Sequence, residues 1–282
     1  MDIITEIKEA REKREALKTY LKGLADMGGS LAVAFSGGVD STFLLATAYE
    51  VLGDGVFAMT VRSDFVPARE ISEAEAFCRE RGIPQYIIEA GSDSIEGFCE
   101  NPTNRCYLCK KEIFGRIMRI AREYGGVAVA EGSNMDDYND YRPGMMAVKE
   151  LGILSPLQEA RLDKDEIRAL SYEMGLPTAD KPPYACLASR FVYGERITTE
   201  KLLMVEKAED YLQSLGFRYV RVRIHGRLAR IEVPADETRR LFETVSEQPV
   251  VEELKKLGFI YVTMDLQGYR VGSMNEAIKQ GK

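Results

Sequence analysis

The sequence contains no apolar run long enough to cross a bilayer. Its longest apolar stretches, residues 31–35 and 56–61, are far shorter than the roughly 20 residues of a membrane-spanning helix. The opening residues, MDIITEIKEAREKREALK, are charged and lack the apolar region and cleavage site of a secretion signal. We therefore expect a soluble protein of the cytoplasm.

The chain also lacks the excess of basic residues that marks nucleic-acid-binding proteins. It carries 38 Lys and Arg against 45 Asp and Glu, a formal net charge of −7. Surfaces that follow phosphate backbones need clustered positive charge, so the composition argues against a nucleic-acid partner. Apolar residues make up 45% of the 282 residues, which is enough for a folded core.

Cysteine is scarce and odd in number. The five residues are Cys78, Cys99, Cys106, Cys109 and Cys186. An odd count in a chain without a secretion signal argues against a disulfide framework and favours metal binding or thiol chemistry. Cys78 follows the apolar stripe of a predicted helix and is expected in the core, whereas Cys99 is interpreted either as a core thiol or as an additional metal ligand.

Cys106 and Cys109 form a C-x-x-C motif, a spacing that lets two thiolates face one metal. A zinc site needs four ligands, but the sequence has no second C-x-x-C pair, and its single histidine, His225, lies in a predicted hairpin turn. With Cys186 the pair makes three thiols, which suit a [4Fe-4S] cluster with one open iron that can hold an extra sulfide. A redox disulfide and buried thiols stay open as alternatives.

Apolar strand candidates alternate with helical patterns through the first two thirds of the chain. The predicted strands are residues 31–35, 56–61, 85–89 and 127–130. The predicted helices are residues 2–25, 41–52, 68–81, 110–124 and 163–174. Short, continuously apolar strands separated by helices predict an α/β fold with a doubly wound parallel sheet.

The pattern changes after the Pro-rich turn at Lys181. The elements predicted there are a helix at 198–215, strands at 217–224 and 228–233, a helix at 250–257 and a strand at 259–266. Their order predicts a smaller α+β domain at the C-terminal end. We therefore expect two domains, residues 1–185 and residues 186–282.

The most informative segment is SGGVDST, residues 36–42, directly after a predicted strand. Gly37 and Gly38 let the backbone bend sharply and present amide groups to an anion, and the helix that follows adds its positive dipole end. Hydroxyl donors come from Ser36, Ser41 and Thr42. A Gly-Gly turn alone could be an ordinary strand-to-helix connection, but this combination predicts a phosphate site.

Asp40 places a carboxylate inside this anion-binding loop. A carboxylate beside phosphates makes sense if it holds Mg²⁺. The loop is not a Walker A motif, because the GxxxxGK[ST] spacing and its lysine are absent.

Residues 36–41 resemble the pyrophosphate loop (PP-loop) of the ATP pyrophosphatases, adenine nucleotide alpha hydrolase-like proteins that split ATP into AMP and pyrophosphate. Further segments resemble the LarE family, the ATP-dependent sulfur transferases that build the nickel-pincer nucleotide cofactor of lactate racemase. These segments are residues 131–137 (EGSNMDD), 141–144 (YRPG), 155–157 (SPL), 181–190 (KPPYACLASR) and 228–233 (LARIEV). The match spans about residues 30–235, and the segment around Cys186 is its most specific part.

The resemblance implies that the protein uses ATP and Mg²⁺ to adenylate a carboxylate of pyridinium-3,5-dicarboxylate mononucleotide, and then converts it to a thiocarboxylate. It implies catalytic parts for Cys186, Asp40 and Arg190. The expected ATP site comprises Ser36, Gly37, Gly38, Asp40, Ser41, Thr42, Gly132, Asn134 and Asp136. The last three follow the predicted strand at 127–130, at the edge where α/β sheets bind ligands.

Three arginines are the expected contacts of the substrate phosphate: Arg190, Arg221 and Arg223. Arg221 and Arg223 alternate along a predicted strand, so both point to one face of the sheet. Two guanidinium groups on one face can bind a phosphate, and a solvated strand face is the alternative. Glu209 and Glu232 are weaker candidates for a metal or substrate contact.

The sulfur source divides LarE-like proteins into two branches. In one branch, a single cysteine at the position of Cys186 gives up its own sulfur and is left as dehydroalanine. The other branch adds a C-x-x-C pair and carries sulfur on a three-cysteine [4Fe-4S] cluster, a pattern that Cys106, Cys109 and Cys186 match. The resemblance also implies a homo-oligomer.

Two rival functions stay open. A tRNA thiolation enzyme also combines a PP-loop with cysteines, although the net charge of −7 disfavours a tRNA partner. A non-catalytic adenine-nucleotide sensor is the second rival, and it would leave Asp40 and the three cysteines without a task.

Overall fold

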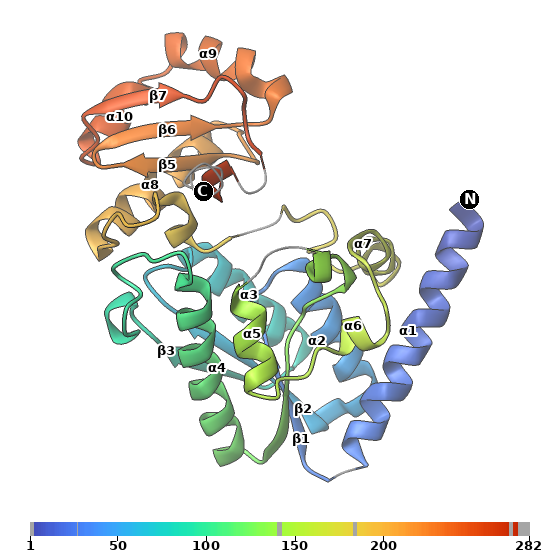
Figure 1. Cartoon of the computed structure of the whole chain (residues 1–282). Coiled ribbons are helices and arrows are strands. Elements are labelled where there is room, and N and C mark those ends of the chain that lie inside the picture. Colours follow the sequence, from blue (N-terminus) through green and yellow to red (C-terminus); the bar gives the residue numbers. More distant parts are fainter. Residues whose placement is uncertain (1–2, 27, 140–142, 183–184, 271–272, 276–282) are drawn as a thin grey trace. The chain divides into compact units, whose positions relative to one another are not determined.

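The computed structural model describes residues 3–26, 28–139, 143–182, 185–270 and 273–275 (Figure 1). Tyr141 and Arg142 of one LarE-like segment, and Pro183 and Tyr184 of another, lie outside these described residues. The chain divides into two compact units. The first unit comprises residues 1–63, 68–90 and 106–184, and the second comprises residues 64–67, 91–105 and 185–282.

The first unit is built on a parallel sheet in the order β3-β2-β1-β4. Its strands are β1 (Ser30–Ala34), β2 (Val56–Arg62), β3 (Gln85–Glu89) and β4 (Gly126–Ala130). Its helices are α1 (Ile3–Ala25), α2 (Val39–Leu52), α3 (Ala68–Arg81), α4 (Arg105–Glu123), α5 (Pro143–Glu150), α6 (Pro156–Glu159) and α7 (Lys164–Glu173). The predicted α/β fold with a parallel sheet is confirmed.

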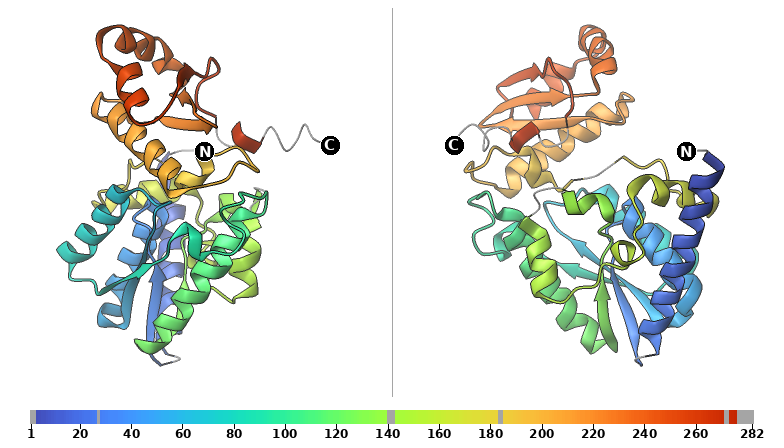
Figure 2. Two further views of the ribbon diagram at one scale, coloured as in Figure 1. Left: turned by 90° about the vertical axis from the view of Figure 1, so that its left-hand side faces the viewer. Right: turned by 45° about the vertical axis from the view of Figure 1, so that its right-hand side comes forward.

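Helices cover both faces of this sheet. Successive side chains of each strand point to opposite faces and therefore join different cores. Leu31 and Val33 of β1 join one core with residues of α1, α2, α3 and α7. Ala32, between them, joins a second core with residues of α4 and α5. The views of Figure 2 show helices on each side of the sheet.

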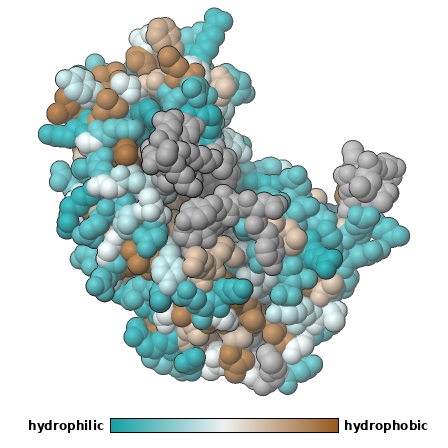
Figure 3. Space-filling model, viewed as in Figure 1, coloured by the Kyte–Doolittle hydropathy of each residue, from teal (hydrophilic) through white to brown (hydrophobic). Residues whose placement is uncertain are grey.

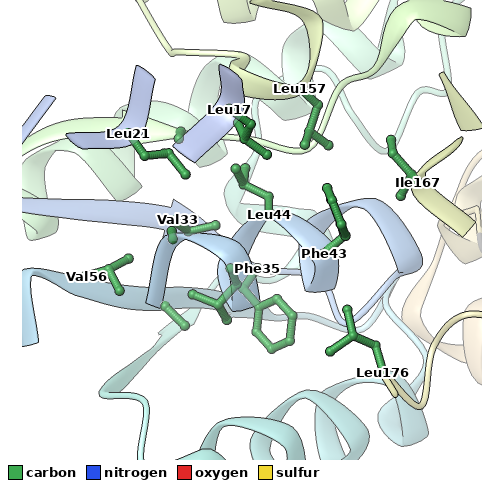
Figure 4. Packing of buried hydrophobic residues seen from close by; sticks show 14 of the residues in the cluster. Leu17, Leu21, Val33, Phe35, Phe43, Leu44, Val56, Leu157, Ile167 and Leu176 are labelled. Atoms are coloured by element: carbon green, nitrogen blue, oxygen red, sulfur yellow. The ribbon is translucent and has the colours of Figure 1, made fainter. Parts of the chain in front are cut away.

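The first core fixes the start of α2. Phe43 and Leu44 of α2 are fully buried and lie among side chains of α1 and β1 such as Leu17, Leu21 and Val33 (Figure 4). Burying large side chains of this kind stabilises the fold by about 1.5–3 kcal/mol each. The strand β1 and the helix α2 are therefore held firmly on both sides of the loop that joins them.

The second unit holds a three-stranded sheet in the order β5-β6-β7. Its strands are β5 (Arg221–His225), β6 (Leu228–Glu232) and β7 (Tyr261–Met264), and its helices are α8 (Thr199–Ser214), α9 (Thr238–Glu247) and α10 (Val250–Lys256). β5 and β6 are antiparallel, and β7 runs parallel to β6. This small α+β sheet is the C-terminal element that the sequence predicts.

Two segments from the first half of the sequence fold with the second unit. The rings of Phe65 and Phe98 lie 4.9 Å apart, and the amide of Leu187 donates to the carbonyl of Phe65 at 2.9 Å. The side-chain amide of Asn101 donates to the carbonyl of Val192 at 2.6 Å. Residues 64–67 and 91–105 are thus part of its core.

On the face drawn in Figure 3, hydrophilic residues prevail, and hydrophobic ones stand in small groups among them. A search of the described helices for a stretch long and apolar enough to span a membrane finds none.

Candidate functional site

The loop after β1 turns sharply at Gly37. This residue has φ +71°, a left-handed conformation that favours glycine, and an added Cβ would lie 3.2 Å from the Cβ of Ala74. The hydroxyl oxygens of Ser36 and Ser41 lie 3.1 Å apart, and the Ser41 hydroxyl also contacts the carbonyl of Gly38 at 3.2 Å. The structure therefore brings the predicted loop residues together at the start of α2.

The first turn of α2 offers backbone amides to a ligand. Its N-cap residue is Gly38, which has no side chain to occupy these amides, and the helix follows directly. Thr42 is fully buried, and its hydroxyl oxygen has no hydrogen-bond partner among the described residues. Free amides at the positive end of a helix dipole form a site for an anion.

The loop after β4 packs against the same turn. An added Cβ on Gly132 would lie 2.9 Å from the backbone nitrogen of Ser41, so only glycine permits this approach. Glu131 is buried and accepts hydrogen bonds from Ser133 and Ser155, which fix the loop. β1 and β4 are neighbours from which the chain leaves in opposite directions, the switch point where open α/β sheets bind ligands.

Asp40 lies at the centre of this site. Its Oδ2 is 2.5 Å from the Nζ of Lys164, and its Oδ1 accepts a hydrogen bond of 3.1 Å from the side-chain amide of Asn134. Asp136, also from the loop after β4, accepts a 3.1 Å hydrogen bond from the backbone amide of Lys164. Asp40, Asn134 and Asp136 therefore form one connected group, as a shared ATP site requires.

Lys164 is a site residue that the sequence interpretation missed. It is the first residue of α7, behind the capping box formed by Asp163 and Glu166. A lysine that opens a capped helix reads as an ordinary surface residue, and only the fold brings it to Asp40. The Asp-Lys-Asp-Glu run at residues 163–166 indicates the start of a helix, not a binding site.

Lys181 is the second residue that was missed. Its Nζ donates to the carbonyl of Gly37 at 2.9 Å and lies 2.8 Å from Glu70 Oε2 and 2.6 Å from Glu73 Oε2. Burial raises the pKa of Glu70, and the ammonium of Lys181 opposes this shift. Lys181 thus ties the glycine turn of the loop to α3.

In the second unit, Arg190 is fully buried and forms a two-pronged ion pair with Glu209. Its Nε and Nη2 donate to the two carboxylate oxygens of Glu209 at 2.9 and 2.8 Å. Although burial alone acts the other way on both groups, this pairing raises the pKa of Arg190 and lowers the pKa of Glu209.

Arg221 and Arg223 are also buried, so their strand face is not solvated. Arg223 pairs with the fully buried Glu232, with Nε to Oε2 at 2.9 Å, and Arg221 lies over the ring of Tyr269 at 5.6 Å. Burial and the neighbouring charge of Arg190 lower the pKa of Arg221. The predicted arginines and glutamates thus share one buried charged cluster.

Cys106 and Cys109 lie in the first two turns of α4, three positions apart on one side of the helix, in the first unit. Cys106 is exposed, while Cys109 and Cys186 are half-buried. Cys186 is the N-cap of a 3₁₀ turn, Leu187–Arg190, in the second unit. Among the described residues, no group of three Cys, His, Asp or Glu is placed to hold a metal ion, so the three-thiol site stays a prediction.

The other two cysteines have structural surroundings. Cys78 is buried in the first core, as expected, and burial raises the pKa of its thiol to about 12. The Cys99 thiol donates to the carbonyl of Ser92 at 3.4 Å. The single histidine, His225, is half-buried at the end of β5.

Comparison with known proteins identifies the family. The chain is 39% identical over 271 residues to the pyridinium-3,5-bisthiocarboxylic acid mononucleotide synthase of Lactiplantibacillus plantarum, covering 96% of each protein. The chain belongs to the family of this synthase, the LarE family. As the sequence predicts, this LarE-family protein is an enzyme.

The chain is also similar to two further proteins. The LarE-family chain is 41% identical over 265 residues to the uncharacterized protein slr1717 of Synechocystis, covering 93% of this chain and 99% of that one. It is 28% identical over 197 residues to the tRNA-specific 2-thiouridylase MnmA of Rickettsia felis, covering 56% of this chain and 53% of that one. No protein-family model matches the LarE-family chain.

Proposed function

We propose that the protein is an ATP-dependent sulfur transferase that acts on pyridinium-3,5-dicarboxylate mononucleotide. It adenylates a carboxylate of this substrate and replaces the AMP with sulfur, which yields a thiocarboxylate. The observation that carries the proposal is the 39% identity to the L. plantarum synthase over 96% of both chains. The connected group at the ends of β1 and β4 supports it.

In the first step, a substrate carboxylate oxygen attacks the α-phosphorus of ATP. The bond between the α-phosphorus and its bridging oxygen breaks, and pyrophosphate leaves. The loop amides and the hydroxyls of Ser36, Ser41 and Thr42 would bind the pyrophosphate, while Lys164 balances its negative charge. Gly132, Asn134 and Asp136, in the loop after β4, are proposed to contact the AMP portion.

Asp40 offers the kind of ligand that Mg²⁺ prefers. Its oxygens lie at the anion-binding turn, and Mg²⁺ in ATP sites is often held by one or two carboxylates plus the phosphates. A bound Mg²⁺ would neutralise charge on the phosphates, and Asp40 would be its protein ligand.

In the second step, a sulfur nucleophile attacks the acyl carbon of the adenylate, the bond from that carbon to the AMP oxygen breaks, and AMP leaves. We propose that Cys106, Cys109 and Cys186 hold a [4Fe-4S] cluster, since thiol sulfurs are the donors such clusters use. The cluster would supply the sulfide, with its open iron as the binding position.

A sacrificial Cys186 is the alternative sulfur source. Its thiolate would attack the acyl carbon of the adenylate, the bond from that carbon to the AMP oxygen would break, and AMP would leave as the thioester forms. Removal of the Cα proton and cleavage of the Cβ–S bond would then release the thiocarboxylate and leave dehydroalanine at residue 186. The two routes differ in the final mass of the protein. Only the sacrificial route converts Cys186 to dehydroalanine, which lowers the mass of the chain by one sulfur and two hydrogen atoms.

The buried charged cluster of the second unit supports binding of the substrate phosphate. Its buried members are the three arginines Arg190, Arg221 and Arg223 and the two carboxylates Glu209 and Glu232, so positive charge exceeds negative by one, 3 − 2 = 1. An anion would balance this charge. We therefore propose Arg190, Arg221 and Arg223 together as the contacts of the substrate phosphate.

The test uses anaerobically purified protein mixed with ATP, Mg²⁺ and the pyridinium dicarboxylate mononucleotide. We expect substrate-dependent pyrophosphate release and a thiocarboxylate product detected by mass spectrometry. Pyrophosphate release without any sulfur-containing product would contradict the sulfur transferase. Tight binding of tRNA by the same preparation would favour the tRNA thiolation alternative instead.

We also propose that the protein is a homo-oligomer of the cytoplasm, as membership of the family implies. Light scattering of the purified chain tests the first part, and cell fractionation tests the second.

A further inference from the structure

Buried guanidinium groups donate hydrogen bonds to the backbone carbonyl groups around Cys186. The Nη1 of Arg190 donates to the carbonyl of Ala185 at 2.5 Å and to the carbonyl of Cys186 at 3.1 Å. Both carbonyls belong to the peptide units that flank the Cα of Cys186. The side chain of Arg190 therefore fixes the backbone of this cysteine directly.

Two more arginines hold the next carbonyls of the same loop. The Nη1 of Arg105 donates to the carbonyl of Ala188 at 2.9 Å, and the Nη1 of Arg223 donates to the carbonyl of Ser189 at 3.1 Å. Arg105 ends the segment 91–105, Arg190 belongs to the loop itself, and Arg223 lies in β5. Four of the six carbonyls in residues 185–190 thus accept from Arg105, Arg190 or Arg223.

Each of these arginines is itself fixed by a polar partner. Arg190 is held by Glu209, Arg223 by Glu232, and Arg105 by the side-chain oxygen of Asn101. The exposed fractions are 0% for Arg190, 4% for Arg105 and 6% for Arg223. Away from water, hydrogen bonds from charged donors are strong, and moving any one of them would leave a buried charge without its partner.

The amide side of the loop is anchored as well. The backbone amide of Leu187 donates to the carbonyl of Phe65 at 2.9 Å, and that of Ser189 donates to the carbonyl of Cys186 at 2.9 Å. Phe191, directly after the loop, is bridged to Ile224 of β5. The loop is therefore held from both sides of its backbone, while the Cys186 side chain stays half-buried.

We propose that Arg105, Arg190 and Arg223 are positioning residues that hold the Cys186 loop in one conformation for sulfur transfer. The proposal rests on the proposed function, because it assigns these residues to the second step. It assigns Arg105, which has no expected contact with ATP or with the substrate, no part in pyrophosphate release. Burying three guanidinium groups against one short loop is costly, and a fixed thiol position gives that cost a purpose.

Arg105 is the best residue for the test, because it has no expected substrate contact. Arg105→Met removes the hydrogen bond to Ala188 while keeping most of the side-chain volume. The matched control is Arg240→Met, since Arg240 also donates to two backbone carbonyls of the second unit, those of Leu215 and Gly216. Pyrophosphate and thiocarboxylate are measured for both variants.

For Arg105→Met we expect thiocarboxylate formation to fall by at least about tenfold and first-turnover pyrophosphate release to stay within about twofold. Arg240→Met should keep both rates. Equal loss of both products in Arg105→Met, or wild-type rates of both, would overturn the proposal. Arg105→Lys retains the positive charge with fewer hydrogen-bond donors and should recover part of the rate of thiocarboxylate formation. If Arg105→Met does not fold, Arg105→Lys is the variant that tests the proposal.

Amide hydrogen exchange supplies a readout that does not depend on the reaction. Peptides covering residues 187–191 should exchange at least about tenfold faster in Arg105→Met than in Arg240→Met. Unchanged hydrogen exchange in residues 187–191 would refute the proposal that Arg105 holds the loop, even if thiocarboxylate formation fell. Should the wild-type protein make no thiocarboxylate at all, the proposed function fails, while the exchange result still decides whether Arg105 holds the loop.

Discussion

Asp40 shows how one carboxylate can belong to an anion-binding turn. A negative side chain beside phosphates is unfavourable unless a cation accompanies it. In this structure Lys164 takes that position, 2.5 Å from Asp40 Oδ2. In the proposed function, the phosphates and Mg²⁺ would replace this lysine as the partner of Asp40.

Replacing Asp40 with Asn keeps the shape of the side chain and removes its charge. We expect pyrophosphate formation to fall by at least about 100-fold, the size of effect seen when one electrostatic group of an active site is lost. A quantitative pyrophosphate assay under saturating ATP measures this. Asp54→Asn, at an exposed carboxylate of the first unit, is the control and should leave the rate unchanged. A normal rate in Asp40→Asn would show that the loop has another task.

The titration of His225 can be followed by NMR without overlap from other imidazole signals, because it is the only histidine. Burial, together with the positive charge of Arg230, lowers its pKa below the ordinary value of 6.5. As the pH falls, the unfolded chain therefore takes up this proton before the folded chain does. The stability linked to His225 is complete above pH 6.5 and is lost as the pH falls through the pKa of the folded state.

Urea unfolding of the wild type and of His225→Gln at several pH values measures this contribution. The free energy of unfolding of the wild type should drop more steeply below pH 6.5 than that of the variant. NMR titration of the single imidazole gives the folded pKa directly, and a value at or above 6.5 would contradict the expectation.

The site could be predicted where its residues are close in sequence. Ser36, Asp40 and Thr42 share one turn, and Asn134 follows a strand end, so pattern and topology sufficed to predict that these residues lie together. Lys164 and Lys181 could not be predicted, because each reaches the loop only through the tertiary fold. The buried state of Arg221 and Arg223 was also hidden, since alternation gives the face of a strand but not what covers it.

At the scale of elements, apolar periodicity predicted those whose position depends on burial. The strand at 85–89 and the helix at 68–81 agree with β3 and α3 at both ends. α9 was not predicted, although its sequence is amphipathic, because the helix is short and Leu241 is its only buried residue. α4 begins at Arg105 rather than at residue 110, since contacts of Arg105 with Asn101 and Ala188 fix its first turn.

The loop after β4 and the start of α2 should tolerate no added atom between them. Gly132→Ala would place a Cβ 2.9 Å from the nitrogen of Ser41 and 3.2 Å from the carbonyl carbon of Asp40, and backbone atoms cannot give way cheaply. We expect a loss of about 1–3 kcal/mol in the free energy of unfolding, measured by urea titration, together with reduced pyrophosphate release.

Gly115→Ala is the matched control within the same unit. Gly115 lies inside α4, and an added Cβ meets nothing within 4 Å. Alanine should stabilise this helix by about 0.5–1 kcal/mol and leave pyrophosphate release unchanged. Equal stability of the two variants would mean that the approach at Gly132 is not as close as the structure has it.

At the scale of the whole molecule, the proposed cluster needs three cysteines that are far apart in the sequence, at positions 106, 109 and 186. Anaerobically reconstituted wild-type protein should hold about four iron atoms per chain. Changing Cys106, Cys109 or Cys186 to Ala should remove the iron and its visible absorbance. Metal and sulfide analysis of each variant measures the loss.

Cys99→Ala separates a three-cysteine cluster from one with a fourth thiol. The thiol of Cys99 donates to the carbonyl of Ser92, so we expect this variant to keep its iron. Iron content well below one atom per chain in the wild type would refute the cluster. A loss of mass equal to one sulfur and two hydrogen atoms from the wild-type chain during turnover would identify Cys186 as the sulfur donor.

The backbone passes between the two units five times, after residues 63, 67, 90, 105 and 184. A gene fragment that starts at residue 186 would omit Phe65, Phe98 and Arg105, and so would encode a half without the pieces that complete its interior. The C-terminal portion is therefore not a cassette that recombination could append to or exchange between PP-loop scaffolds.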